Sequence, residues 1–457
     1  MKLFSLNNLW KLSHLAFLGL LLLSVVFAIE RVCYIDSAYM LFRMVNTESI
    51  IAEGGRLTNA IPQFIPWLMI KAGLSLNSIV IGFSFMDIAV LYAVFLLVGI
   101  YFRQKLLASI FVILLMLGVS STFFDVVTET KAALAIAVIL TAALSSDNKT
   151  PFWLLILIVF SGIFSHPVFI LYFFIIIAFF YSKNDAKKYG KLVLAGSILI
   201  GLKIGIIGAT VYEQNLLSIN HLYESFQHSF IHEYISIWLD PYYIALPVIM
   251  LVVVAYLTIN KKWKFLLFYM LSIISLYIIL AVIYSAGDSR MMIQKTMFVL
   301  HFTMLLPLVK IDEKNNFLFK FISPLFFVVL LTTFYSIINA SSAYRERVII
   351  LTDFLKKLPA ESDKYLIHEN NINHDKIMAT WALSHETLLL SNIKYGKSLA
   401  LKNFRDHNDT LQLSKYPNAF RPAFGYPIKK NELNEAYFNP DWTKENKWLD
   451  SAMRLGF

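Results

Sequence analysis

A succession of long apolar runs constrains the fold of this chain more than any other feature. A helix needs about 20 mostly apolar residues to cross a bilayer, and eleven runs approach that pattern. With 58% hydrophobic and 15% charged residues among 457, the chain cannot cover a soluble surface of ordinary polarity. We therefore predict an all-α polytopic membrane protein with about 11 transmembrane helices. They start near Leu15, Ser78, Leu106, Glu129, Phe152, Pro167, Leu192, Ile244, Phe265, Lys295 and Phe317.

The same composition excludes cytosolic enzymes, disordered regulators and coiled coils. A single cysteine, Cys33, excludes disulfide scaffolds and thiolate metal clusters. A formal charge of +10 would indicate nucleic-acid binding on a soluble patch, but here most of it reflects membrane topology, so we expect no nucleic-acid partner. The chain contains no Walker lysine loop, which argues against ATP-driven transport.

The distribution of cations predicts the orientation, because Lys and Arg concentrate in short cytoplasmic loops. With a cytoplasmic N-terminus, alternate connections are rich in lysine, whereas the long connection 213–243 contains neither Lys nor Arg. The turn at Ser165–Pro167 is interpreted as a hairpin, since a mere kink would break this alternation. The C-terminal part is then extracytoplasmic, and a bacterial inner (cell) membrane is the expected setting. The predicted cytoplasmic cations are Arg103, Lys105, Lys149, Lys183, Lys187, Lys188, Lys191, Lys261, Lys262, Lys264, Lys310 and Lys314.

Two domains are predicted, a transmembrane domain over 1–340 and a small extracytoplasmic C-terminal domain over 341–457, of α/β or α+β type. In the latter, Arg345–Leu358 and Met378–Leu390 have helical spacing and Asp363–His368 is typical of a strand.

Interfacial helices are predicted in the outer loops 31–77 and 213–243. The segment from Gly54 to Trp67 is too polar and proline-broken for a crossing, yet too apolar for a free loop. In the second loop, His221, Glu224, His228 and His232 share a helical face. The i, i+4 pair His228 and His232 could chelate zinc, with no third ligand evident, or the helix could simply cover an outer cavity.

Charged residues at the predicted outer face form the candidate site. Helical spacing places Asp36, Met40 and Arg43 on one stripe, so an acid and a guanidinium would face one cavity. Asp125 and Glu129 in the second outer loop could act as a general base or share a divalent cation. They could instead be ordinary acids at a helix N-terminus, where the helix dipole stabilises negative charge. Cations at this level suit a lipid phosphate or ordinary headgroup contacts. They are Arg31, Arg43, Arg56, Lys131, Arg290 and Lys295.

Two charges lie deep in predicted crossings, Asp87 and Lys203. Ionisable groups at this depth are functional by default, although these two could instead neutralise one another in a structural ion pair. His166, in the proline-bounded turn, is expected near the outer face.

Together these residues resemble the GT-C superfamily of integral-membrane glycosyltransferases. Members have many crossings, a long first outer loop with an acid soon after the first helix, an interfacial helix and often an outer C-terminal domain. The matching features are Asp36 in Tyr-Ile-Asp-Ser-Ala-Tyr, the segment Arg56–Trp67 with its Pro-Gln-x-x-Pro, and the acids Asp125 and Glu129.

The resemblance implies transfer of a sugar, with inversion, from a polyprenyl-phosphate-linked sugar donor to a glycan, lipid or protein acceptor on the extracytoplasmic side. Asp36 would be the general base, and arginines such as Arg56 and Arg290 would hold the departing phosphate. Asp125 and Glu129 are the possible second acid or metal ligands, with a divalent cation as a possible cofactor. The remaining candidate substrate-binding residues are Arg43, Gln63, Lys131, His166 and Lys295.

Three alternatives remain open, the weakest of which is a non-catalytic assembly protein. The segment Thr128-Glu-Thr-Lys-Ala-Ala-Leu-Ala, followed by Phe164-Ser-His-Pro, is similar to polysaccharide polymerases of the Wzy and EpsG kind, with Lys131-Ala132 in place of their Arg-Gln. A lipid or solute transporter or flippase would instead use Asp87 and Lys203 as coupling charges.

Overall fold

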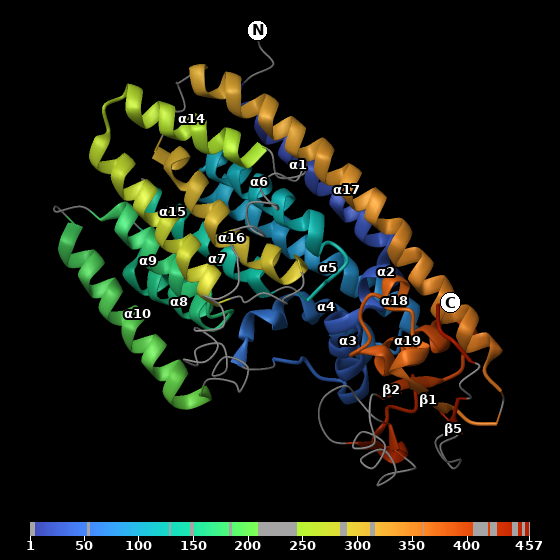
Figure 1. The fold of residues 1–457 in the computed structure, drawn as a ribbon. Coiled ribbons are helices and arrows are strands. Elements are labelled where there is room, and N and C mark those ends of the chain that lie inside the picture. Colours follow the sequence, from blue (N-terminus) through green and yellow to red (C-terminus); the bar gives the residue numbers. More distant parts are fainter. Residues whose placement is uncertain are drawn as a thin grey trace.

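The chain folds as a mostly helical bundle with a few short strands near its C-terminal end (Figure 1). The computed structural model describes residues 5–52, 55–127, 129–146, 150–181, 185–208, 245–283, 290–310, 316–359, 361–404, 419–420, 427–440, 447–449 and 453–456.

Each of the eleven predicted apolar runs coincides with a helix. Four of these helices are long and apolar enough to cross a membrane, namely α1, α5 with its π-helical extension η3 (Leu97–Tyr101), α10 and α17. The protein is therefore a helical membrane protein, whereas the number of crossings stays a prediction. The helices are α1 (Leu6–Val26), α5 (Leu76–Leu96), α6 (Lys105–Thr122), α7 (Glu129–Ser145), α8 (Phe152–Ile163), α9 (Phe169–Phe180), α10 (Ala186–Ile207), α14 (Ala245–Ile259), α15 (Trp263–Ile283), α16 (Arg290–Leu305) and α17 (Asn316–Lys357).

Helix α6 forms the centre of the bundle, and every residue from 106 to 117 is buried. It packs against α1, α5, α7, α16 and α17. In contrast, α10 lies at the periphery and exposes Leu194, Ile198 and Ile206, as expected of a face that meets lipid tails. Close packing of α1 against η3 favours a glycine, because a Cβ on Gly99 would lie 2.1 Å from the Trp10 ring.

The predicted turn at Ser165–Pro167 separates two helices. Helix α8 ends at Ile163 and α9 begins at Phe169, so this apolar stretch is not one kinked helix. The Leu57 N–H donates to the Phe164 carbonyl oxygen at 3.0 Å, which brings this turn to the first outer connection.

The connection between α1 and α5, named the first outer connection after its predicted side, is largely helical. It comprises α2 (Ala28–Val32), α3 (Ile35–Thr47), the 3-10 turn η2 (Leu57–Asn59) and α4 (Ala60–Lys71). A helix does lie in the segment predicted to be interfacial: α4 packs on α5 and exposes Ile61, Phe64 and Leu68 while Gln63 and Ile70 are buried. Its position at a membrane interface stays a prediction. The second predicted interfacial segment, 213–243 with its histidines, lies outside the described residues.

Helix α17 is continuous over 42 residues, about 63 Å, and passes through the predicted domain boundary at residue 340. It runs along one side of the bundle to the C-terminal elements (Figure 1). A rigid helix therefore connects the bundle to the C-terminal elements.

The C-terminal elements form a small α/β unit. Strand β1 lies between β2 and β5 and is parallel to both, and β1 confirms the strand predicted near Asp363. The helix predicted from Met378 begins only at Leu383, because Met378 has a φ of +61°. The elements are β1 (Lys364–His368), η6 (Glu369–Asn371), α18 (His374–Ile377), α19 (Leu383–Tyr395), β2 (Ala400–Phe404), β3 (Ala419–Phe420), β4 (Ile428–Lys429), η7 (Lys430–Glu432) and β5 (Lys447–Trp448), with β3 and β4 antiparallel.

This unit shares a core with the first outer connection. Helix α19 packs against β2 on one side and against α3 and α17 on the other. The Phe42 ring lies 4.9 Å from Phe420 and 5.4 Å from Phe438, between ring centroids. Burial of these apolar side chains therefore joins α3 to the C-terminal elements.

Candidate functional site

A buried ionic cluster connects the start of α7 to α5 and α2. The Asp87 carboxylate, on α5, lies 2.8 Å from the Arg31 guanidinium and 3.2 Å from the Lys131 ammonium. Arg31 is fully buried and also donates to the Phe123 carbonyl at 2.7 Å and to Ser84 at 2.7 and 2.8 Å. Such a saturated guanidinium is a structural anchor.

These contacts correct two sequence-based expectations. The cations that contact Asp87 are Arg31 and Lys131, so the proposed pairing of Asp87 with Lys203 is wrong. Lys203 donates to the Ile163 carbonyl at 2.7 Å, at the end of α8. Arg31 points into the protein rather than toward lipid headgroups. The Asp87 carboxylate gives it a charge-assisted hydrogen bond there, and such a bond is stronger than one to a neutral partner.

A second contact set joins the start of α3 to the segment before α7. The Ser37 hydroxyl donates to Asp125 at 3.3 Å and accepts from the Val126 N–H at 2.9 Å. The Lys131 ammonium also donates to the Asp125 carbonyl at 3.2 Å. The two connections that carry Asp36 and Asp125 therefore contact one another.

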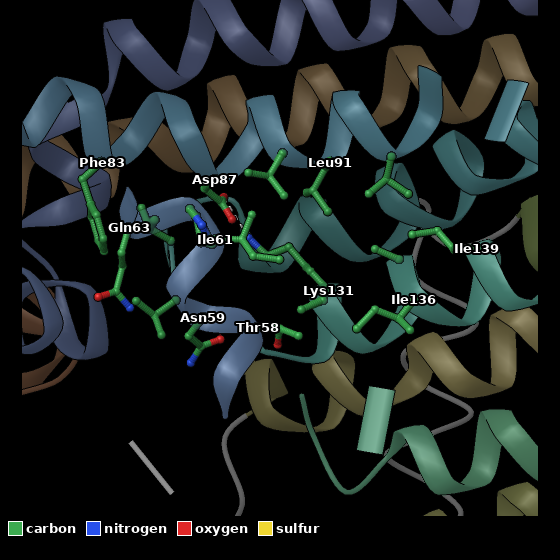
Figure 2. Close-up of a pocket in the computed structure, with 17 residues that line it drawn as sticks. Thr58, Asn59, Ile61, Gln63, Phe83, Asp87, Leu91, Lys131, Ile136 and Ile139 are labelled. Carbon is green, nitrogen blue, oxygen red and sulfur yellow. Dashed lines mark hydrogen bonds and ion pairs between the residues drawn. The ribbon is translucent and has the colours of Figure 1, made fainter. Parts of the chain in front are cut away.

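A cavity of about 140 Å³ lies between α4, α5 and α7 (Figure 2). In that view, polar side chains including Gln63, Asn59 and Asp87 lie at the left and centre, and Ile136 and Ile139 lie at the right. The lining residues are Thr58, Asn59, Ile61, Pro62, Gln63, Phe83, Asp87, Val90, Leu91, Val94, Val126, Val127, Lys131, Ala132, Ala135, Ile136 and Ile139.

The cavity is amphipathic. Its lining includes the Lys131 ammonium and the Thr58 hydroxyl, which is buried with no hydrogen-bond partner. It also includes aliphatic residues of α5 and α7. A buried hydroxyl without a partner costs free energy unless a ligand or water satisfies it. The lining therefore matches the junction between a polar head and an apolar chain, and at about 140 Å³ the cavity holds only that part of such a ligand.

Glu129 forms a further polar group beside this cavity. Its carboxylate accepts from Arg56 at 2.5 Å and from the Asn59 amide at 3.2 Å, and Asn59 itself lines the cavity. The pair between Arg56 and Glu129 is about one quarter exposed. Arg56 is thus held by an acid, and a phosphate entering the cavity would compete for the same guanidinium.

Asp36 lies in the first turn of α3, half-buried, and is not a cavity-lining residue. Its neighbour Ser37 contacts Val126, which does line the cavity. The segment is helical as predicted, and the Arg43 guanidinium donates to the Tyr39 hydroxyl at 3.2 Å. Arg43 does not line this cavity either, so the expectation that Asp36 and Arg43 face one cavity stays a prediction. Asp36 is connected to the cavity wall through its neighbour Ser37, which contacts the lining residue Val126.

Gln63 and His166 have local roles that the sequence did not indicate. The Gln63 amide accepts from the Ile51 N–H and donates to the Ile51 carbonyl, both at 2.9 Å. The His166 ring accepts from the Val168 N–H at 3.2 Å, at the start of α9. Gln63 thereby fixes α4 against the segment around Ile51, and it also lines the cavity.

The last two predicted cations lie in the first part of α16, where the backbone alone is described. Arg290 is the first residue of that helix and Lys295 lies in its second turn. Their side chains lie outside the described part of the structure, so their role as phosphate ligands stays a prediction.

The acids predicted as metal ligands already have polar partners. Glu129 is engaged by Arg56 and Asn59, and Asp125 by Ser37. Within the described residues no group of three His, Cys, Asp or Glu side chains could hold a metal ion. The catalytic steps proposed below use no metal.

A buried ion pair in the C-terminal unit supports the start of α3. Glu386, on α19, pairs with Arg347 of α17 and accepts the Ile35 N–H at 2.8 Å. Ile35 has a φ of +32°, which is strained for a β-branched residue. Burial raises the pKa of Glu386, and the Arg347 guanidinium opposes this shift. The backbone next to Asp36 is thus held by residues more than 300 positions away.

His385 lies in an aromatic enclosure between α3 and α19. Its ring centroid is 5.2 Å from Tyr39, 5.0 Å from Phe42 and 5.4 Å from Phe420. Neither ring nitrogen has a hydrogen-bond partner. Burial lowers the pKa of His385 to about 3, and the nearby Lys402 and Arg43 charges add to this shift. The imidazole is therefore neutral at physiological pH.

Comparison with protein-family models, with curated proteins and with solved structures found no match for this chain.

Sequence reasoning did not single out Thr58, Asn59, Arg347 or Glu386. A signal existed for the first two, because they are polar residues directly before the amphipathic helix α4. No local signal existed for Arg347 and Glu386, since surface helices carry such charges routinely.

Proposed function

We propose that this protein is an integral-membrane glycosyltransferase that moves a sugar from a polyprenyl-phosphate donor to an acceptor at the extracytoplasmic face. The observation that carries the proposal is the amphipathic cavity, whose lining combines Lys131 and Thr58 with aliphatic residues of α5 and α7. A phosphate bears the charge that an ammonium group binds, and an isoprenoid chain suits an aliphatic lining.

The proposed topology has eleven crossings, a cytoplasmic N-terminus and an extracytoplasmic C-terminal unit. Four helices have the length and polarity of crossings, and six shorter apolar helices accompany them. Helix α7 would complete the set, buried among its neighbours. This arrangement gives the alternating lysine-rich connections that the positive-inside rule requires.

In the proposed reaction, the Asp36 carboxylate removes the proton of the acceptor hydroxyl. The acceptor oxygen then attacks the anomeric carbon from the face opposite the phosphate, which inverts the configuration. The bond between that carbon and the phosphate oxygen breaks, and the polyprenyl phosphate leaves with the electron pair and one additional negative charge. Arg56 and Lys131 would stabilise this developing charge.

A surface-polysaccharide polymerase is the second candidate. Lys131 and Ala132, the residues of that resemblance at the start of α7, both line the cavity. A polymerase would join lipid-linked repeats into a long chain, whereas the transferase adds one sugar. The transporter hypothesis loses its coupling pair, because Asp87 is bound to Arg31 and Lys131.

The proposal is tested with purified protein in nanodiscs and a panel of synthetic polyprenyl-phosphate sugars. Release of polyprenyl phosphate is measured by thin-layer chromatography, and the acceptor product by mass spectrometry. Asp36→Asn is expected to lower kcat at least about a hundredfold, the range of a lost general base. A ladder of long glycans from oligosaccharide-linked lipid would favour the polymerase instead.

Glu48→Gln is the matched control, because Glu48 ends the same helix and pairs with Lys71 at an exposed site. It should retain wild-type turnover. If no lipid-phosphate sugar is cleaved by the wild type, or if Asp36→Asn and Glu48→Gln turn over equally, the assignment of the reaction to this site is wrong.

A further inference from the structure

A second, basic cavity of about 630 Å³ lies far from the candidate site, between the turn that joins α14 to α15 and the 3-10 segment η5 (Leu306–Lys310). In Figure 1 the turn between α14 and α15 lies at the end of the bundle opposite to β1 and β2. The predicted topology makes this the cytoplasmic face. The lining is Tyr256, Leu257, Lys261, Lys262, Trp263, Lys264, Phe265, Pro307 and Lys310.

The cavity is strongly cationic. Four of its nine lining residues are lysines, and the described lining contains no carboxylate. The Lys310 ammonium is fixed in place, since it donates to the Phe179 carbonyl at 3.1 Å and lies 4.6 Å from the centre of the Phe179 ring and 5.6 Å from that of Phe265. Lys262 lies 5.4 Å from the Tyr256 ring. Converging ammonium groups of this kind bind an anion.

An apolar strip continues from the cavity along the surface of α15. Trp263 lines the cavity and is 58% exposed, and tryptophan is enriched where a helix leaves the hydrocarbon region. Below it, exposed leucines and isoleucines recur at helical spacing on the same face. They are Leu267, Leu271, Ile274 and Ile278.

We infer that this cavity binds the headgroup of an anionic phospholipid from the cytoplasmic leaflet, with its acyl chains on the α15 strip. The lysines select negative charge, and the adjoining strip selects a lipid over free phosphate. Four lysines match a headgroup with two phosphates, so cardiolipin is the preferred ligand. The site is separate from the proposed glycosyl transfer, and binding at it requires no catalysis.

Lipid binding is measured by native mass spectrometry of the full-length protein in nonionic detergent, titrated with cardiolipin or phosphatidylcholine. The wild type should retain cardiolipin and not phosphatidylcholine. The triple variant Lys261→Gln, Lys262→Gln, Lys264→Gln should bind cardiolipin at least about tenfold more weakly, because each lysine near a membrane surface contributes to the attraction of anionic lipid.

The matched control is the triple variant Lys187→Gln, Lys188→Gln, Lys191→Gln on α10, which removes the same charge from another predicted cytoplasmic segment. It should bind cardiolipin as the wild type does, and equal elution of all three proteins in size exclusion confirms that they fold. Equal binding by both triple variants overturns the site. Two outcomes overturn the lipid assignment. One is binding of phosphatidylcholine as tight as that of cardiolipin. The other is complete displacement of cardiolipin by inorganic phosphate at about 20 mM, a saturating level.

Discussion

The Lys131 ammonium group lies 3.2 Å from the Asp87 carboxylate, and both residues line the cavity between α4, α5 and α7. The same carboxylate oxygen contacts Arg31 at 2.8 Å. One acid therefore holds two buried cations, and it keeps the charged part of the cavity lining in position for an anionic ligand.

Asp87→Ala should strongly destabilise the bundle. The substitution leaves Arg31 and Lys131 buried without their acid, and breaking a buried pair costs about 3–5 kcal/mol. Thermal unfolding in detergent, followed by intrinsic fluorescence, should show a clearly lower midpoint. Asp353→Ala, at an exposed position of α17, is the control and should leave the midpoint unchanged. Equal midpoints for the two variants would show that Asp87 does not stabilise this cluster.

Arg56→Gln should separate binding from stability. Its ion pair with Glu129 is partly exposed, so the loss in free energy of unfolding should stay within about 1 kcal/mol. The KM for the lipid-phosphate donor should rise about tenfold or more, as expected for a lost charge-assisted hydrogen bond. Lys71→Gln, which removes an exposed pair with Glu48, should change neither quantity. An unchanged KM in Arg56→Gln would remove this arginine from the donor site.

Arg347 and Glu386 should show strong energetic coupling. Arg347→Met or Glu386→Leu alone leaves one buried charge without its partner and should cost about 3–5 kcal/mol. The double variant should recover part of this loss, because no unpaired charge is left in the core. Midpoints of thermal unfolding and the rate of proteolysis of the C-terminal unit measure the cycle. Additive losses in the double variant would contradict a direct coupling.

His385 should make the C-terminal unit sensitive to acid. Its pKa is about 3 in the fold against 6.5 in the unfolded chain, so only the unfolded chain gains a proton between these values. The contribution of His385 to the free energy of unfolding is therefore fully present above about pH 6.5. It falls by about 1.4 kcal/mol per pH unit as the pH decreases toward 3. Unfolding midpoints of the wild type at pH 7 and pH 5 measure this loss.

His385→Leu should remove that part of the slope while its aromatic enclosure stays filled. The control is His374→Leu, because His374 is half exposed and pairs with Glu369 at the surface. A wild type and a His385→Leu variant with the same dependence on pH would show that His385 does not cause the acid sensitivity.

Much of the helical architecture was predictable from local pattern. Apolar runs mark all eleven bundle helices, and the proline at Pro167 correctly indicates the break between α8 and α9. The amphipathic pattern before Trp67 identifies α4. These features are encoded in short stretches, because helix formation and burial of one face depend on neighbouring residues.

The site was only partly predictable. Charges that are expensive to bury, such as Asp87 and Lys131, can be recognised in the sequence, but their partners cannot. The expected partner Lys203 is 116 positions from Asp87 in the chain, while the observed partner Arg31 is 56 positions away. Nothing in the local pattern distinguishes these two cations.

The sequence by itself determined that this is a helical membrane protein, where its helices lie and which charges must find partners. The tertiary structure alone decided that Asp87 pairs with Arg31 and Lys131, that Glu386 supports the backbone beside Asp36, and that α4, α5 and α7 enclose an amphipathic cavity. The physical reason is that helical periodicity selects the buried face of each helix, whereas ion pairs and cavities depend on the relative packing of helices that are distant in the chain.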